Sequence, residues 1–282
     1  MMSTKSSIKK VCFVFVNYND APTTISCIKS IESISKSECK IEIIVVDNAS
    51  DKKDIESLSA EVQKRSNIEL VLSEKNLGYF SGLNLGLSRI PPDEDQFVVI
   101  GNNDILYPEN FLSVLTENKE KIVQYAVISP DIVTLDGSHQ NPHVVHSISA
   151  FREILYDLYF TNYYLGMLIT KIARVTNKFT DRDDENQHEI PQTIYQGYGA
   201  CYILPPLFFK HFSQLWAPTF LMGEELFLSK QLEEKSLKIF YEPAIRVTHC
   251  LHASTEKIPG KKKWEISRES HKVYRKYVKI WS

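Results

Sequence analysis

The stretch FVVIGNNDILYP, Phe97–Pro108, places an apolar run directly before three oxygen-bearing side chains. The run is rich in valine, which predicts a strand that is covered on both faces. Asn102, Asn103 and Asp104 then occupy the point where the strand ends. Because open α/β sheets bind ligands outside the carboxyl ends of their strands, this tip predicts a binding site. The simpler alternative is that Asp104 only opens the following turn, a position that Asp and Asn favour.

Other apolar runs earlier in the chain also end in polar residues. Examples are VCFVFV at Val11–Val16 and IEIIVVD at Ile41–Asp47, and helix-like segments separate them. This alternation is typical of a parallel sheet with crossover helices. Because the carboxyl ends of parallel strands meet at one edge of a sheet, we expect Asn17, Asp47 and Asp104 to converge on one ligand.

The composition is that of a globular protein without a strong overall charge. Of 282 residues, 43% are hydrophobic and 24% are charged, and 33 Lys and Arg residues nearly balance 35 Asp and Glu residues. This balance argues against nucleic acid as a partner. Five cysteines without close pairing predict reduced thiols, and we find neither an apolar signal segment nor a run of roughly 20 apolar residues. We therefore expect a cytoplasmic location, which leaves open a contact with the inner face of the plasma membrane.

Common nucleotide-binding signatures are missing from the sequence. The first strand is not followed by G-x-G-x-x-G, and no P-loop pattern is present. Both patterns place backbone N–H groups around phosphates, so their absence argues against a nicotinamide or flavin enzyme and a P-loop NTPase. The glycine-rich Arg and Pro-Lys signature expected of a sugar-phosphate nucleotidyltransferase is also missing.

Six short motifs follow one another along the chain. In order they are VNYN at Val16–Asn19, VVDNASD at Val45–Asp51, NLGYFSGLNLG at Asn76–Gly86, NND at Asn102–Asp104, GYGACYIL at Gly197–Leu204, and GEELFLSKQLEEKSLKIFYEPAIRVTH at Gly223–His249. Together they resemble glycosyltransferase family 2, and within it the bacterial, rhamnosyltransferase-like branch of cell-surface polysaccharide synthesis. The resemblance covers roughly Val11 to Ser254, and it does not specify a substrate.

The resemblance implies an α/β fold of the GT-A type, with a mostly parallel central sheet flanked by helices, a helical insertion and a C-terminal basic helix. It also implies inverting transfer of a hexosyl or rhamnosyl group from a nucleoside-diphosphate sugar to a hydroxyl of a glycan or lipid-linked acceptor. Carried over residue by residue, the donor site comprises Asn17, Tyr18, Asp47, Gly78, Asn84, Asn102 and Asn103. Asp47 has a simpler alternative as a helix cap, and Gly78 has one as a turn residue.

A divalent ion, Mn²⁺ or Mg²⁺, is the cofactor that the resemblance implies, with Asp104 and His249 as its ligands. A cation bound by few protein oxygens can hold a diphosphate as it leaves, and a neutral imidazole can ligate Mn²⁺. A histidine at a strand end is as often a satisfied surface group, so both interpretations of His249 stay open.

The acidic pair Glu224-Glu225 supplies the catalytic candidates. In the family that the chain resembles, the second carboxylate of such a pair takes the acceptor proton, which makes Glu225 the expected base. The alternative is that both residues complement a helix dipole. Phe227 and Gln231 depart from the Asp and Arg often found there. A catalytically impaired nucleotide-sugar or glycan-binding protein of the same fold is therefore a second hypothesis.

The expected organisation is one GT-A domain over residues 1–254 and a basic, aromatic tail over 255–282. Within the domain, residues 1–104 form the nucleotide-binding half, and 105–254 form the acceptor half with a helical insertion at about 150–178. The apolar stripe of this insertion and the lysines of the tail are features of a peripheral membrane contact, although a helix packed on the core would show the same stripe.

Overall fold

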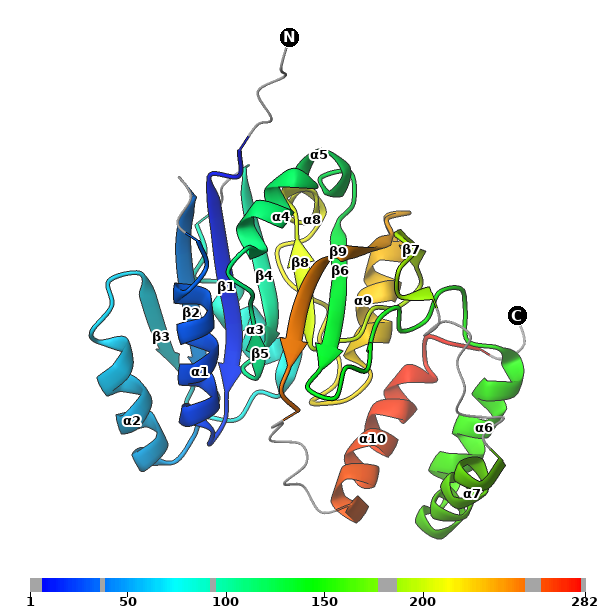
Figure 1. The fold of residues 1–282 in the computed structure, drawn as a ribbon. Coiled ribbons are helices and arrows are strands. Elements are labelled where there is room, and N and C mark those ends of the chain that lie inside the picture. The colour runs from blue at the N-terminus through cyan, green and yellow to red at the C-terminus, as the bar shows by residue number, and fades with distance from the viewer. Residues whose placement is uncertain (1–6, 36–38, 92–94, 177–186, 252–259, 280–282) are drawn as a thin grey trace.

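A mixed sheet runs through the molecule, which is described here by a computed structural model (Figure 1). The structure describes residues 7–35, 39–91, 95–176, 187–251 and 260–279. Within these residues the sheet has nine strands in the order β3-β2-β1-β4-β8-β6-β9-β5, and β7 pairs with β9. The expected α/β architecture is confirmed.

The first half of the chain forms the parallel part of the sheet. Strands β1, β2, β3 and β4 pair in parallel, and three helices connect them. These elements are β1 (Lys10–Asn17), α1 (Ala21–Glu32), β2 (Lys40–Asp47), α2 (Lys52–Val62), β3 (Ile68–Leu72), α3 (Tyr79–Leu87) and β4 (Gln96–Asn102). The polar motifs after β1, β2 and β4 therefore lie at one edge of the sheet, as expected from the sequence.

The second half adds strands of both directions. β8 is antiparallel to β4 and to β6, whereas β6 and β9 are parallel. The elements are β5 (Ile105–Leu106), α4 (Phe111–Glu117), α5 (Lys119–Ile122), β6 (Val127–Thr134), α6 (Ala150–Thr161), α7 (Tyr163–Thr176), β7 (Gln192–Ile194), β8 (Cys201–Leu204), α8 (Pro206–His211), α9 (Glu224–Glu233), β9 (Ile239–His249) and α10 (Gly260–Tyr274). β5 pairs with the end of β9, which brings Asp104 and His249 together.

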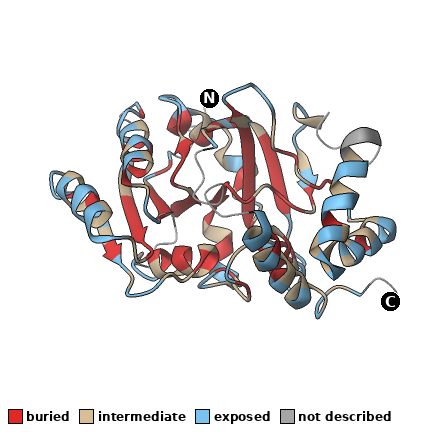
Figure 2. Cartoon of the chain, turned by 90° about the horizontal axis from the view of Figure 1, so that it is seen from below, coloured by how far each residue is buried: buried red, intermediate tan, exposed pale blue. Residues whose placement is uncertain are grey.

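Both faces of the sheet are covered, and alternate residues of β1 show this directly. Phe13 and Phe15 belong to the apolar cluster that includes α1, whereas Cys12 and Val14 belong to the cluster that includes α3. Figure 2 shows the sheet as largely buried, with exposed residues over the outer helices. This two-sided burial is why the first strands read as continuous apolar runs.

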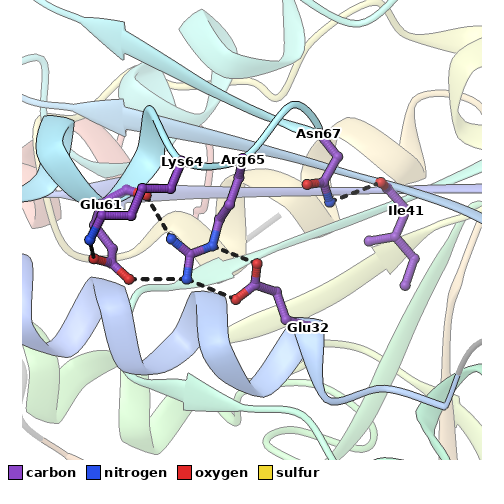
Figure 3. Close-up of polar contacts among 6 residues, drawn as sticks. All are labelled: Glu32, Ile41, Glu61, Lys64, Arg65 and Asn67. Atoms are coloured by element: carbon purple, nitrogen blue, oxygen red, sulfur yellow. Dashed lines mark hydrogen bonds and ion pairs between the residues drawn. The ribbon is translucent and has the colours of Figure 1, made fainter.

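Ion pairs on the surface hold α1 and α2 together (Figure 3). The guanidinium of Arg65, just after α2, contacts the carboxylate of Glu32 at 2.5 Å and that of Glu61 at 3.0 Å. Asn67 donates a hydrogen bond to the carbonyl of Ile41 on β2 at 3.4 Å. Surface pairs of this kind are weak because water and salt screen them, so the buried clusters dominate the stability of this half.

The predicted helical insertion is a pair of helices. The apolar stripe continues from α6 into α7, but Asn162 breaks the helix with φ −148° and ψ 140°. Its side-chain oxygen accepts a hydrogen bond from the N–H of Tyr164 at 2.8 Å, which starts the second helix. Asn bonds readily to nearby backbone and so favours such breaks. Residues 177–178 of the predicted insertion, like 255–259 and 280–282 of the predicted tail, lie outside the described residues.

The basic tail forms α10, which packs against α6. Arg275 contacts the carboxylates of Glu153 at 2.9 Å and Asp157 at 2.5 Å, and His271 contacts Asp157 at 2.8 Å. Hydrogen bonding to His271 and Arg275 lowers the pKa of Asp157 despite its partial burial. Among the described residues, no helix is both long and apolar enough to cross a bilayer.

Candidate active site

A cavity of about 580 Å³ opens at the carboxyl ends of the parallel strands. Its lining comes from loops after β1, β2 and β4, from the start of α3, from the segment before β8, from the start of α9, and from α10. Of the residues expected in the site, those that line the cavity are Tyr18, Gly78, Asn102, Asn103, Asp104, Glu224 and Glu225. Together with the other lining residues, the tertiary structure gathers residues from all six motifs and from both halves of the chain.

A chain of buried hydrogen bonds lies beneath this cavity. Asn103 donates to the hydroxyl of Thr24 at 2.9 Å, and Thr24 donates to the side-chain oxygen of Asn17 at 2.7 Å. The amide nitrogen of Asn17 lies 2.8 Å from Asp47 and 2.7 Å from Asp54. The network links the ends of β1, β2 and β4, and it fixes the loops that follow them.

Asn17 and Asp47 are therefore fully buried, and neither is among the residues that line the cavity. The second oxygen of Asp47 accepts the N–H of Ser50 at 2.9 Å, so both its oxygens have partners within the protein. The helix cap that was its alternative is made by Asp51, which accepts the N–H of Asp54 at 3.0 Å. A direct contact between Asp47 and a nucleotide base stays a prediction.

The loop that ends at Gly78 is held by the neighbouring asparagine Asn48. Its amide nitrogen donates to Asn76 at 3.0 Å and to the carbonyl of Gly78 at 2.9 Å, and its oxygen accepts the N–H of Leu77 at 2.8 Å. Gly78 has φ +84°, and a Cβ there would lie 1.8 Å from the carbonyl oxygen of Phe220. Only glycine permits this conformation and this approach, so Gly78 shapes the wall of the cavity.

Asn84 lies away from this cavity, although the sequence placed it in the nucleotide pocket. Its side chain donates to the carbonyl of Leu215 at 2.8 Å and accepts the N–H of the same residue at 2.8 Å. Both polar ends of the amide are thus used to hold the segment after α8 against α3. A contact between Asn84 and the nucleotide stays a prediction.

Asp104, which lines the cavity, forms a close polar pair with His249, which is buried and is not among the lining residues. The Nε2 atom of His249 lies 3.1 Å from Oδ1 of Asp104, and the two side chains are 3% and 1% exposed. Neither carboxylate oxygen of Asp104 nor Nε2 of His249 has a hydrogen-bond partner in the described structure, so the close contact is not aligned as a hydrogen bond. Buried polar atoms without partners are rare and require an explanation.

A divalent cation fits this pair. Nδ1 of His249 lies 2.7 Å from the side-chain oxygen of Gln140, which assigns the ring proton to Nδ1 and leaves the lone pair of Nε2 available. Carboxylate oxygen and imidazole nitrogen are suitable donors for Mn²⁺. No group of three or more His, Cys, Asp or Glu residues converges in the described ranges. The protein would therefore supply two ligands here, and the remaining positions suit phosphate oxygens and water.

The two glutamates at the start of α9 have different surroundings. Glu224 is 7% exposed and accepts the N–H of Met222 at 3.0 Å. Burial, and then the charge of Glu225, raises the pKa of Glu224 to about 8. Glu225 is half-buried, lines the cavity, and accepts the N–H of Gly199 at 3.3 Å. Glu225 is therefore the more accessible carboxylate of the pair.

Glycine at position 199 allows this arrangement. A Cβ there would lie 2.8 Å from Oε1 of Glu225, which is too close for an ordinary contact. The carbonyl of Gly199 accepts a hydrogen bond from the hydroxyl of Tyr79 at 2.8 Å. The backbone at Gly199 is thus held from α3 on one side and orients Glu225 on the other.

The rim segment Phe220–Met222 is fastened by three helices. The carbonyl of Phe220 accepts the N–H of Tyr79 at 3.1 Å. The carbonyl of Leu221 accepts the hydroxyl of Ser270 on α10 at 2.6 Å. Met222 has φ +74°, a strained value for a non-glycine residue, and Glu224 accepts its N–H. Several hydrogen bonds thus hold the rim in place, as is usual for strained backbone at a functional site.

The two departures at Phe227 and Gln231 are explained by packing. Phe227 is buried against Trp216 at a ring-centroid distance of 5.2 Å, and Tyr277 completes this cluster. Gln231 accepts the N–H of Trp216 at 2.9 Å and donates to the carbonyl of Gln214 at 2.8 Å. Both side chains hold the segment that precedes the rim.

Several lining residues were not predicted from the sequence. Asn48 is adjacent to Asp47 in the same motif, so its position was a usable signal. Tyr198 and Gly199 belong to a motif that was recognised without a role for its glycines. Lys262 comes from the C-terminal tail, and nothing in the local sequence connects that lysine with a strand edge more than one hundred residues away in the chain.

The parallel half-sheet with a polar cavity at its carboxyl edge, joined to a mixed half, is the GT-A architecture. The sequence matches the family model described as Glycosyl transferase family 2 over residues 12–185. The chain therefore belongs to glycosyl transferase family 2. The match ends before α9, so Glu224, Glu225 and His249 lie outside it. No curated protein sequence matches the chain significantly.

Solved structures of similar fold include two glycosyltransferases. GalNAc-T7 with UDP, GalNAc and Mn²⁺ superposes with a TM-score of 0.57 at 14% identity, over 88% of this chain and 44% of that one. The mannosyltransferase PcManGT from Pyrobaculum calidifontis, in complex with GDP-Man and Mn²⁺, gives 0.56 at 15% identity, over 93% and 61%. At these identities the likeness shows the fold alone. The chain spans about half the length of these proteins.

Proposed function

We propose that this protein transfers a glycosyl group, with inversion, from a nucleoside-diphosphate sugar to a hydroxyl group of a glycan or lipid-linked acceptor. The observation that carries the proposal is the pairing of Asp104 and His249, whose facing polar atoms have no hydrogen-bond partner in the described structure, at the cavity that Glu225 also lines. Asp104 and His249 suit a cation that also binds a diphosphate, and Glu225 suits the role of proton acceptor. Family membership supports the same reaction class.

The donor nucleotide would occupy the side of the cavity formed by the parallel strands. Tyr18 is 40% exposed there and offers an aromatic face for a base. Asn102 and Asn103 suit contacts with ribose hydroxyls, while Gly78 allows close approach of backbone. Asn17 and Asp47 would act mainly beneath this surface, by holding the loops in place.

A divalent ion, Mn²⁺ or Mg²⁺, would be held by Asp104 and His249, and when bound it would neutralise charge on the departing diphosphate. Both solved structures named above contain Mn²⁺. Asp104 contributes the charge, and His249, with its proton on Nδ1, contributes a neutral lone pair. Gln140 thus orients His249 by accepting the Nδ1 proton.

Glu225 would act as the general base. The acceptor oxygen forms a bond to the anomeric carbon while the bond from that carbon to the diphosphate oxygen breaks. The hydroxyl proton passes to Glu225, and the electron pair of the broken bond leaves with the diphosphate. Glu224, whose pKa is raised, would remain largely protonated near neutral pH and so would not compete for the proton.

The proposed role is in bacterial surface polysaccharide synthesis. The six motifs support the rhamnosyltransferase-like branch, with residues 1–104 serving the donor and 105–254 serving the acceptor. The proposal includes rhamnosyl and other hexosyl donors, carried on UDP, dTDP or GDP.

A peripheral contact with an anionic membrane would suit a lipid-linked acceptor. Eight of the fifteen exposed large apolar side chains in the described residues lie on α6 and α7, which is a strong concentration in two short helices. Residues 150–176 and 260–279 hold eleven basic and four acidic residues in a chain whose net charge is −2. These helices extend beyond the sheet on the side of its carboxyl ends (Figure 1). Apolar side chains and basic charge together favour an anionic bilayer surface.

Thermal unfolding in the presence of candidate donors tests the donor and the metal. Wild-type protein with Mn²⁺ and a panel of UDP, dTDP and GDP sugars should show a rise of about 5 °C with one nucleotide class at saturating concentration. The rise should disappear in chelator and in Asp104→Asn protein. Product formation that continues undiminished in chelator would refute the metal assignment.

The alternative is a binding protein of the same fold without turnover. Donor binding without product, across a panel of acceptors, would favour it. The departures at Phe227 and Gln231 that suggested it are packing contacts, so they give no separate reason to expect lost turnover.

A further inference from the structure

The cavity contains several acids and few bases. Asp104, Glu224 and Glu225 line it, of which Glu224, with its raised pKa, adds little charge near neutral pH, and Lys262 is the basic side chain among the lining residues of the described structure. A nucleoside diphosphate brings at least two further negative charges to the same space. A single divalent cation at Asp104 leaves negative charge in excess, so a further positive group at the cavity would favour binding.

The helix that carries Lys262 is fixed at the cavity rim. Ser270 is buried and donates to the carbonyl of Leu221, which itself lines the cavity. Trp264 is 6% exposed, and its indole N–H donates to the carbonyl of Tyr159 on α6 at 3.3 Å. These two anchors fall on either side of Ile266, and they hold α10 against both the rim and the helix pair.

Lys262 and Ile266 are four residues apart, so they share one face of α10. Both line the cavity, which means that this face is turned toward it. None of the ion pairs between described residues involves Lys262, and its side chain is exposed. Its ammonium group is therefore available for a ligand in the cavity.

We propose that Lys262 binds a phosphate oxygen of the nucleoside diphosphate in this cavity, so that α10 is part of the donor site. The proposal rests on the proposed function, because it requires that a nucleoside diphosphate occupies the cavity. It gives the C-terminal helix a direct role in donor binding, in addition to its contact with α6. It also gives a role to the basic residue that shares the cavity with the acidic start of α9.

Nucleotide affinity in charge-matched variants tests the proposal. UDP, dTDP and GDP are titrated by calorimetry, with Mn²⁺, into wild type, Lys262→Ala, Lys262→Arg and Lys261→Ala protein. Lys261 is adjacent and exposed but does not line the cavity, so its variant removes the same charge from the same helix. We expect Kd to rise roughly five- to fifty-fold in Lys262→Ala, the effect of a lost charge-assisted contact. Lys262→Arg should keep most of the affinity, and Lys261→Ala should change Kd by less than about two-fold.

The outcomes separate this proposal from the proposed function. If wild-type protein binds none of the three nucleotides, both fail. If it binds one of them and Lys262→Ala binds it equally well, only the role of Lys262 is refuted. Equal losses in Lys261→Ala and Lys262→Ala would also refute it, because the effect would then come from the general charge of α10. Circular dichroism of each variant establishes that α10 and the rest of the chain are folded.

Discussion

Replacement of Glu225 by glutamine should abolish most turnover and leave donor affinity unchanged. Glutamine has the same size, and its side-chain oxygen can still accept the N–H of Gly199, which Glu225 accepts at 3.3 Å. The amide cannot take a proton from the acceptor hydroxyl. Loss of a general base costs roughly two to four orders of magnitude in kcat, which is about 3 to 5 kcal/mol of activation free energy.

The assay measures kcat and donor Kd on the same folded protein. Initial rates are taken with the donor that stabilises the wild type, and donor Kd is measured by calorimetry with Mn²⁺. Glu233→Gln is the matched control, because it removes a carboxylate from the exposed end of the same helix. Glu225→Asp should retain partial activity, since its shorter side chain withdraws the carboxylate from Gly199.

Two results would refute the assignment of the base. Near-normal kcat in Glu225→Gln would move the base to Glu224 or to another group. A large loss of donor affinity with little change in kcat at saturation would give Glu225 a structural or metal-binding role instead.

Three further predictions concern stability, geometry and membrane contact. The folded-state pKa of Glu224 is about 8 against 4.5 for the free group, so the unfolded chain holds fewer protons between these values and the free energy of unfolding falls as pH rises through this range. Glu224→Gln should remove this loss. The Tm of the variant should therefore match that of wild type at pH 4 and exceed it at pH 7.5, by the equivalent of up to about 4 kcal/mol. A Tm difference that does not depend on pH would contradict this. Gly199→Ala places a Cβ 2.8 Å from the carboxylate of Glu225, so kcat should fall about ten- to one-hundred-fold with donor Kd unchanged. An unchanged kcat would show that the close approach of Glu225 to the backbone of residue 199 is unimportant. In flotation with anionic vesicles, binding should weaken as salt is raised. It should weaken further in Leu168→Glu but not in Leu135→Glu, a still more exposed leucine outside the helix pair (67% against 52%). Equal behaviour of both variants would mean that α6 and α7 are ordinary solvent-exposed helices.

Sequence patterns located the strands of the parallel half closely. Val11–Val16 and the run from Phe97 read as continuous apolar segments because both faces of these strands are covered by helices. The polar motif after each strand then had to fall at the same sheet edge, because parallel strands share their direction. These constraints act over few residues, so local sequence was sufficient for them.

Local sequence was less informative about where a helix is interrupted. The stripe over 151–175 predicted one helical insertion, and the periodicity is indeed helical on both sides of Asn162. The break itself depends on one side chain that bonds to the backbone two residues later. Apolar periodicity carries no information about such a bond.

The tertiary structure alone decided which polar residues face the cavity. Asn17, Asp47 and Asn84 are as polar as Asn102, but they do not line the cavity, and their side chains form hydrogen bonds with protein groups at 2.7 to 3.2 Å. A polar residue at a strand end satisfies whichever partner the surrounding loops bring within reach, and these loops come from distant parts of the chain.

The return of the C-terminal helix to the site shows the same limit most clearly. The sequence predicted a basic, aromatic tail over 255–282 with a C-terminal basic helix, because charge and composition reside in the residues themselves, and the structure places this helix at residues 260–274. That Lys262 lines the cavity depends on the packing of Trp264 on α6 and of Ser270 on the rim. Contacts between elements far apart in the chain are set by complementary shape and hydrogen bonding, which leave no periodic trace in the sequence.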